Sequence, residues 1–144
     1  MALSESIQQL KPHTVLIPST ANGRDYAPRV AARLGLGLTA DCVGLDLGER
    51  GELIQLKPAF GGQIVAPIIS STWPQMATVR PGMLGVAAAD WSRRCEVKHL
   101  KVSRGEDSRY KVVESSHSAA RAAAELDDAE VIVCVGMGIG GPEN

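Results

Sequence analysis

Two short runs of β-branched and apolar residues constrain the fold of this chain more than any other feature. The runs are Thr14–Ile17 and Val131–Val135, and both have the composition of strands that are covered on both faces. A loop that contains glycine follows each run, and a helical pattern follows the first loop. Strand, loop and helix in this order predict an α/β unit built on a parallel sheet, in which both runs are buried strands.

The loop after the first run carries residues that could meet an anion. Ser19–Arg24 precedes a helix that we expect to begin near Asp25 and to hold Pro28 in its first turn. A helix N-terminus beside an arginine could bind a phosphate, so an adenine-nucleotide site is one interpretation. The other is a capped turn in which Gly23 has a positive φ and Arg24 pairs with Asp25 or a neighbouring carboxylate. One Arg and one Gly fall short of a complete phosphate motif, which favours the capped turn.

The middle of the chain predicts a series of strands and hairpins. Short runs separated by Gly or Pro carry this pattern: Asp41–Leu47, Glu52–Lys57, Gln63–Ser70 and Met76–Arg80. We therefore expect an antiparallel portion that extends from Asp41 to Arg80. Farther along, Cys95–Val102 alternates partly in polarity, which predicts a half-exposed edge strand.

A glycine-rich turn follows the second apolar run. Gly136, Gly138 and Gly141 match the pattern G-x-G-x-x-G, whose glycines let a backbone approach a pyrophosphate. That motif also needs a following helix whose N-terminus faces the phosphates, and the sequence stops at Asn144. From these residues alone, a dinucleotide contact and a plain glycine-rich turn are equally open.

The charge balance and the cysteines exclude several classes of function. Fifteen basic residues stand against sixteen acidic ones, which leaves no field of one sign to favour nucleic acid. Three widely spaced cysteines show neither zinc-site nor disulfide spacing, which indicates free thiols in a reducing compartment. No apolar run reaches the roughly 20 residues that span a bilayer, and the start of the chain lacks a signal-peptide pattern. We expect a soluble, cytoplasmic protein with no metal site and no membrane insertion.

No arrangement of residues points to catalysis. The histidines are scattered, and no Ser or Cys stands in a nucleophile motif, so a hydrolytic triad has no support and we expect no catalytic residue. Arg80 precedes Pro81 and Gly82, which suit the central positions of a type II turn. We interpret Arg80 as a buried or interface residue that pairs with a carboxylate or with backbone carbonyls.

Several segments, taken in order, carry a resemblance to a known family. They are TANGRDYAPRVAARLG from Thr20 to Gly35, LTADCVGLDL from Leu38 to Leu47, KPAFGGQIVAPI from Lys57 to Ile68, and PQMATVRPG from Pro74 to Gly82. All resemble the amino-terminal domain of electron-transfer flavoprotein α subunits. The closing AEVIVCVGMGIGGPEN, Ala129 to Asn144, is similar to the first strand and glycine turn of that family's FAD-binding domain.

The resemblance implies a fold class and a division of the chain. It implies an α/β, Rossmann-like three-layer domain with a largely parallel sheet and an antiparallel, strand-rich middle portion. Residues 1–104 would be part of the amino-terminal domain, 105–128 a connector with a short helix, and 129–144 the start of the FAD-binding domain. Family members begin with a further strand and helix and continue through a carboxy-terminal domain. We therefore expect a truncated piece of an α subunit or a natural short paralogue.

The resemblance also implies where a cofactor would bind. In the full-length protein, FAD would contact Gly136, Met137, Gly138 and Gly141, whereas this segment alone is expected to hold none. The family usually has an Arg at the position of Met137. A thioether cannot stabilise a reduced, anionic flavin as a cation can, so the flavin environment would differ from the usual one.

The implied function is electron carriage rather than catalysis on a substrate. The implied partners are a β subunit, flavin dehydrogenases and a downstream acceptor, with this segment acting mainly as scaffold and subunit interface. We expect Phe60, Trp73 and Arg80 to face a partner, because apolar residues with an Arg are hard to place in one small core. The alternatives are an adenine-nucleotide-binding α/β domain and a docking scaffold without a cofactor.

Overall fold

The computed structural model describes residues 2–103, 111–115 and 129–141. The chain divides into two units, Met1–Glu106 and Asp107–Asn144, and each is treated by itself. The elements in chain order are α1 (Ala2–Leu10), β1 (Thr14–Pro18), α2 (Ala21–Leu34), β2 (Leu38–Cys42), β3 (Gly44–Leu47), β4 (Leu53–Ala59), η1 (Phe60–Gly62), β5 (Ile64–Ile68), β6 (Gln75–Val79) and η3 (Met137–Ile139).

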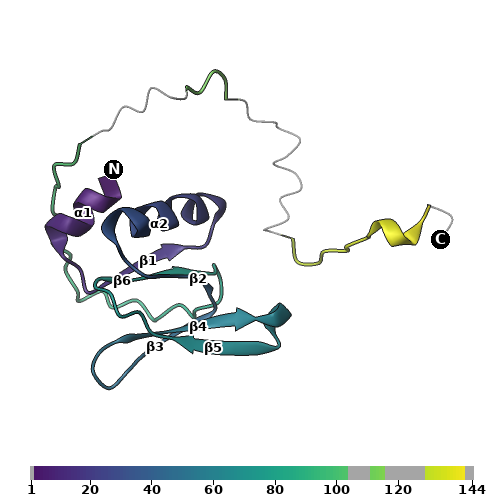
Figure 1. The fold of residues 1–144 in the computed structure, drawn as a ribbon, viewed down its shortest axis with the longest axis horizontal. Helices are drawn as coiled ribbons and strands as arrows, with labels where there is room; N and C mark the ends of the chain where they lie inside the picture. The colour runs from purple at the N-terminus through teal and green to yellow at the C-terminus, as the bar shows by residue number, and fades with distance from the viewer. Residues whose placement is uncertain (1, 104–110, 116–128, 142–144) are drawn as a thin grey trace. The chain divides into compact units, whose positions relative to one another are not determined.

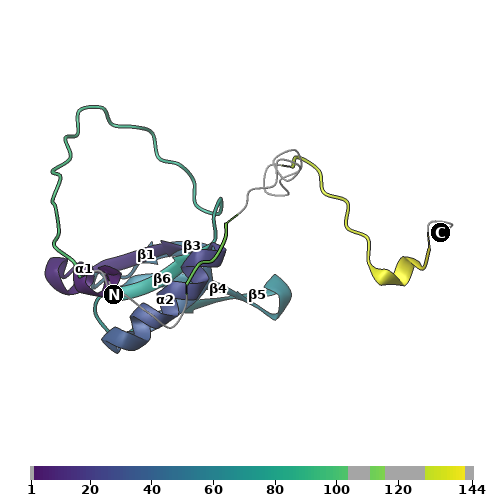
Figure 2. The same ribbon diagram turned by 90° about the horizontal axis from the view of Figure 1, so that it is seen from above.

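The first unit is built in three layers. α1 and α2 cover one side of a parallel sheet with the strand order β1-β6-β2, and an antiparallel sheet with the order β3-β4-β5 lies on the other side (Figure 1). Figure 2, seen from the helix side, shows both helices in front of the strands. This mixed α/β architecture confirms the predicted Rossmann-like fold class, with a hairpin sheet as the third layer.

β6 is the central strand of the parallel sheet, and this corrects one expectation. Met76 pairs in register with Val15 of β1 on one side and Leu38 of β2 on the other, both in parallel. The antiparallel portion therefore comprises β3, β4 and β5 and does not extend to Arg80. The physical reason is burial, because Met76 and Ala77 are fully covered, as both faces of a central strand must be.

The core of the first unit lies between the helices and the parallel sheet. It consists of Ile7 from α1, Ile17 from β1, Met76 from β6, and three residues of α2, namely Ala27, Val30 and Ala31. On the opposite face of β1, Leu16 is half-exposed. The predicted strand Val15–Ile17 therefore exists, but it is buried mainly on its helix side.

α2 begins four residues earlier than the sequence suggested. Thr20 caps it, since the Thr20 hydroxyl accepts a hydrogen bond from the Gly23 backbone N–H at 3.2 Å. Asp25 is therefore not the cap, and Pro28 lies inside the helix at an exposed position rather than in the first turn. The helix ends at Leu34, where Gly35 takes a left-handed conformation with φ of 65°.

Gly23 is the point where α2 touches the backbone of β1. Its φ is not positive, which corrects the expected turn, because Gly23 belongs to the first turns of the helix. A Cβ built on Gly23 would collide with the carbonyl oxygen of Pro18 and lie 3.2 Å from Cγ2 of Ile17. The missing side chain therefore lets the helix pack directly on the strand that precedes it.

The predicted edge strand at Cys95–Val102 does not form. The segment has no strand partner among the described residues, and hydrogen bonds join its end to α1 instead. The Gln9 side-chain amide donates to the Lys101 carbonyl at 2.9 Å, and the Ser103 backbone N–H donates to the Glu5 carboxylate at 2.7 Å. Partial alternation did not suffice because a strand also needs a neighbouring ladder to satisfy its backbone.

The predicted strand at Val131–Val135 is also wrong. These residues form no strand, and Val131 and Val133 are more than four-fifths exposed. In the described residues of the second unit no other strand offers backbone hydrogen bonds, so an apolar run alone cannot become a buried strand. The short helix expected within 105–128 lies outside the described residues.

Within the part of the chain that the structure describes, no helix is long and apolar enough to cross a membrane.

Candidate functional site

The three parallel strands bring polar residues together at their carboxyl ends. Ser19 follows β1, Asp41 lies near the end of β2, and Arg80 follows β6. Binding sites of open α/β sheets form outside the carboxyl ends of the strands, where loops are free to carry functional side chains. This edge of the sheet is therefore the first place to look for a site.

Asp41 and Arg80 form a two-point ion pair. Arg80 Nη2 donates to Asp41 Oδ2 at 2.6 Å, and Arg80 Nε donates to Asp41 Oδ1 at 3.2 Å. Gly82 has a φ of 76°, and the Met83 N–H reaches the Arg80 carbonyl at 3.4 Å, as the predicted turn over Pro81 and Gly82 requires. The interpretation of Arg80 as a residue paired with a carboxylate is confirmed.

The backbone at Asp41 is shaped to present its carboxylate. The pairing of β2 with β6 is irregular between Thr39 and Cys42, and Asp41 there has a φ of 61°, which is uncommon for a residue with a side chain. The Asp41 N–H donates to the hydroxyl of buried Thr78 at 2.8 Å. Such a conformation costs about 1–3 kcal/mol and persists when surrounding bonds hold it.

Arg24 lies on the other side of the same carboxylate. Its Nε donates to Ser19 Oγ at 3.1 Å, and its Nη2 lies 3.7 Å from Asp41 Oδ1. The predicted pairing of Arg24 with a neighbouring carboxylate thus holds, although the neighbour is Asp41 and not Asp25. Asp25 pairs instead with Arg29 one helical turn later, at 3.4 Å.

These contacts shift the protonation equilibria of the pair. The hydrogen bonds from Arg80 hold the pKa of the Asp41 carboxyl below its ordinary value, with smaller contributions from Ser19 and from the charge of Arg24, and partial burial opposes them. The same hydrogen bonds raise the pKa of Arg80. Both members of the pair therefore stay charged across the neutral range.

We expect Asp41 to contribute to stability at neutral pH and to lose that contribution in acid. A carboxyl whose pKa is lower in the folded state stabilises the fold above its unfolded-state pKa of about 3.9, and this contribution disappears as the pH falls through the folded-state value. In urea unfolding at a series of pH values, Asp41→Asn should flatten the acid limb of the stability curve. Asn also tolerates a positive φ, so the backbone is retained.

A second variant checks the cause of that effect. Arg80→Gln should produce much of the same flattening, and the double variant should add little, because one interaction is removed twice. Identical acid limbs in Asp41→Asn and the original chain would contradict the assignment.

The residues expected to face a partner do not form one cluster. Phe60 is 78% exposed at the β4–β5 connection, whereas Trp73 precedes β6 and Arg80 follows it. A five-residue strand places Trp73 and Arg80 about 17 Å or more apart, at opposite ends of the parallel sheet. The interface role of the three residues stays a prediction.

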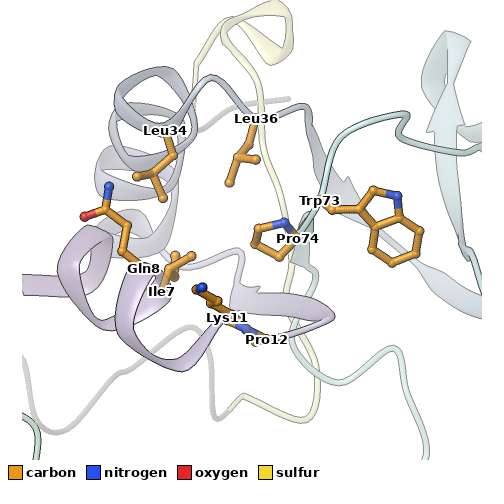
Figure 3. A pocket seen from close by; sticks show the side chains of 8 residues that line it. All are labelled: Ile7, Gln8, Lys11, Pro12, Leu34, Leu36, Trp73 and Pro74. Carbon is orange, nitrogen blue, oxygen red and sulfur yellow. The ribbon is translucent and has the colours of Figure 1, made fainter.

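A groove lies at the amino end of the strands, beside Trp73. It encloses about 450 Å³ between the end of α1, the end of α2 and the segment before β6. Figure 3 shows Leu34, Leu36, Ile7 and Pro74 around this groove, with the Trp73 ring beyond Pro74. The Trp73 ring packs edge-on against His13, with ring centres 4.4 Å apart.

The glycine turn of the second unit does not by itself enclose a cofactor. Met137 is almost fully exposed, and a Cβ built on Gly136 or Gly138 would meet nothing within 4 Å. The Ile139 N–H reaches the Gly136 carbonyl at 3.2 Å, so the turn is local. The described residues therefore do not fit a flavin on their own, and FAD contacts at Gly136, Met137, Gly138 and Gly141 stay a prediction.

No group of three or more side chains suited to a metal ion occurs in the described ranges.

Comparison with known proteins decides the family. The family model described as electron transfer flavoprotein domain matches residues 1–104, which include every helix and strand of the first unit. The chain belongs to the electron transfer flavoprotein family. The resemblance seen in the segments from Thr20 to Gly82 is thereby confirmed.

Similar chains occur in proteins of several organisms. The chain is 44% identical over 144 residues to "Electron transfer flavoprotein subunit alpha" of Thermoanaerobacterium thermosaccharolyticum, covering 99% of this chain and 43% of the relative. It is 39% identical over 147 residues to the protein of the same name from Clostridium acetobutylicum, covering 99% and 44%. It is 37% identical to "Lactate dehydrogenase (NAD(+),ferredoxin) subunit LctC" of Acetobacterium woodii, covering 95% and 33%. The chain thus spans less than half the length of these relatives.

Asp41 is the site residue that sequence reasoning missed. The run Asp41–Leu47 was assigned to a hairpin, which placed this carboxylate at the start of an antiparallel strand. Had Leu38–Cys42 been recognised as a parallel strand, Asp41 would have fallen at the same edge of the sheet as Arg24 and Arg80.

Proposed function

We propose that this chain is part of an electron transfer flavoprotein α subunit, in which the first unit serves as scaffold and as docking surface for a β subunit. In the whole protein, electrons would pass from flavin dehydrogenases to a downstream acceptor. The observation that carries the proposal is 44% identity over almost the entire chain to a protein named "Electron transfer flavoprotein subunit alpha". A cytoplasmic location accompanies this proposal.

The proposal assigns different tasks to different parts of the chain. Residues 1–104 act as scaffold and interface, 105–128 connect, and 129–144 open the FAD-binding domain. FAD supplies the electron-carrying chemistry when it is bound in the whole protein.

The adenine-nucleotide alternative receives no support from a specific contact. Asn22–Arg24 belongs to the first turns of α2, where the Gly23 N–H is used by Thr20 and the Arg24 guanidinium contacts Ser19 and Asp41. The segment considered as a phosphate-binding loop is therefore the capped first turn of α2, and its polar groups bind other residues of this chain.

Trp73→Ala should weaken binding to the β subunit of the same organism by about 1–2 kcal/mol, as expected for a half-exposed Trp that anchors a partner. The test mixes this chain with that β subunit and measures the dissociation constant by isothermal titration calorimetry. Leu47→Ala removes an exposed apolar side chain elsewhere and serves as the control. If the original chain does not bind the β subunit, the proposed docking function is wrong, whereas equal affinity of Trp73→Ala removes only Trp73 from the interface.

A further inference from the structure

The ion-pair cluster at the carboxyl edge of the sheet has more positive than negative charge. Arg24 and Arg80 both form ion pairs with the carboxylate of Asp41. The Lys57 ammonium donates a hydrogen bond at 2.7 Å to the carbonyl of Ala40, the residue before Asp41. Two guanidinium groups around one carboxylate leave an excess of positive charge. Asp25, which follows Arg24 in the sequence, pairs with Arg29 instead.

The guanidinium of Arg80 retains an unused hydrogen-bonding edge. A guanidinium carries five N–H donors, and Asp41 takes the edge formed by Nε and Nη2. Within the described ranges no hydrogen bond uses Nη1, and the Arg80 side chain is 45% exposed. The edge formed by Nη1 and Nη2 can therefore receive a second planar acid in the same two-point manner.

Asp41 fixes the orientation of the Arg80 guanidinium, including its unused edge. The irregular backbone at Asp41, held by the buried Thr78 hydroxyl, fixes the carboxylate, and the carboxylate in turn fixes the plane of Arg80. A preorganised guanidinium loses less entropy on binding than a free side chain. Asp41 is thus a positioning residue for Arg80.

The exposed position of the cluster suits contact with another protein better than binding of a small ligand. Arg24 is 62% exposed and Arg80 is 45% exposed, so both guanidinium groups stand at the surface. The groove described above lies at the opposite, amino end of the strands and could not receive the body of a ligand whose anion bound here. Arginine is enriched at protein interfaces, where it binds carboxylates of the partner.

We propose that Arg80, clamped by Asp41 and supported by Arg24, is the docking point for a carboxylate on an acidic surface of the β subunit. This inference rests on the proposed function and adds the chemistry of the contact. It makes complex formation depend on ionic strength, and it makes the planar shape of Arg80 as important as its charge.

The test measures dissociation constants with the β subunit of the same organism at two salt concentrations. Arg80→Ala should weaken binding about 30-fold at low salt and flatten the salt dependence, because a buried two-point ion pair is a typical interface anchor. Arg80→Lys should weaken it about 10-fold, since an ammonium keeps the charge but cannot bind Asp41 and a second carboxylate in two-point fashion. Arg24→Ala should weaken it less than Arg80→Ala.

The control is Arg29→Ala, which removes an exposed arginine of α2 that lies outside the cluster, and which should change affinity less than about twofold. Thermal unfolding of each variant verifies that it is folded, and Arg80→Lys keeps the test valid if Arg80→Ala does not fold.

Affinities of Arg80→Ala and Arg80→Lys equal to that of the original chain overturn the docking point alone. Loss of affinity in Arg80→Ala with full affinity in Arg80→Lys overturns the two-point contact. Absence of binding by the original chain overturns the proposed function together with this inference.

Discussion

Gly23→Ala should lower the free energy of unfolding of the first unit by about 2 kcal/mol, even though alanine is the better helix former. In an exposed helix this change would gain about 1 kcal/mol. At this position the added methyl would collide with the carbonyl oxygen of Pro18, which is backbone and cannot move aside as a side chain can. Overpacking of about 1–3 kcal/mol, occasionally more, must therefore exceed the gain in propensity.

Urea unfolding followed by circular dichroism measures this change. For a unit of this size the loss corresponds to a fall in Tm of about 10 °C or more. Asn22→Ala is the matched control, since it adds helix propensity at the exposed neighbouring position and should leave stability within about 0.5 kcal/mol. A Gly23→Ala variant as stable as the original chain would show that α2 does not pack on the backbone of β1 at Gly23.

The same change has a consequence at the candidate site. Arg24 follows Gly23, and its contacts with Ser19 and Asp41 depend on where the first turn of α2 rests on β1. A helix displaced by the collision would carry the Arg24 guanidinium away from the Asp41 carboxylate. Packing at one glycine thus positions one member of the charged cluster.

The sequence predicted local features of the first unit well where the residue composition and the positions of Gly and Pro indicated the same conformation. Thr14–Pro18, the β4 and β5 hairpin, and the turn over Pro81 and Gly82 all have residues that suit one conformation. The start of α2 was misplaced because Thr20 and Asp25 are both good caps. The packing of Gly23 against β1 favours Thr20 as the cap, and contacts between a helix and a strand cannot be inferred from a local sequence pattern.

Pairing between strands was much harder to predict. Gln75–Val79 follows β5 after a short connection, so the chain order favoured an antiparallel neighbour, whereas β6 inserts between β1 and β2. The Val131–Val135 run failed for the complementary reason. Its residues suit a buried strand, but no described strand of the second unit pairs with it, and burial depends on a partner more than on composition.

The candidate site depended on this same topology. Arg24, Asp41 and Arg80 are far apart in the sequence, and they meet because β6 lies between β1 and β2 with all three strands parallel. Arg80 and Arg24 were each expected to pair with a carboxylate, but that carboxylate could be identified only from the strand order.

This 144-residue chain, purified alone and mixed with FAD, should retain no stoichiometric flavin. The turn from Gly136 to Gly141 offers a few backbone N–H groups, while Met137 and the Val131–Val135 run stand exposed around it. Binding costs about 4–15 kcal/mol in lost translational and rotational freedom and in ordering. A local turn that encloses nothing cannot offset that cost, whatever its glycine pattern.

The measurement is the visible absorption spectrum after gel filtration of the chain with excess FAD. A protein of known FAD content, treated in the same way, is the positive control. Stoichiometric flavin in the short chain would contradict the prediction and would show that the first unit or the turn already contains a site. In that event Arg24→Ala separates the two places, because loss of the flavin in this variant would locate the site at the carboxyl edge of the parallel sheet, where Ser19, Asp41 and Arg80 lie.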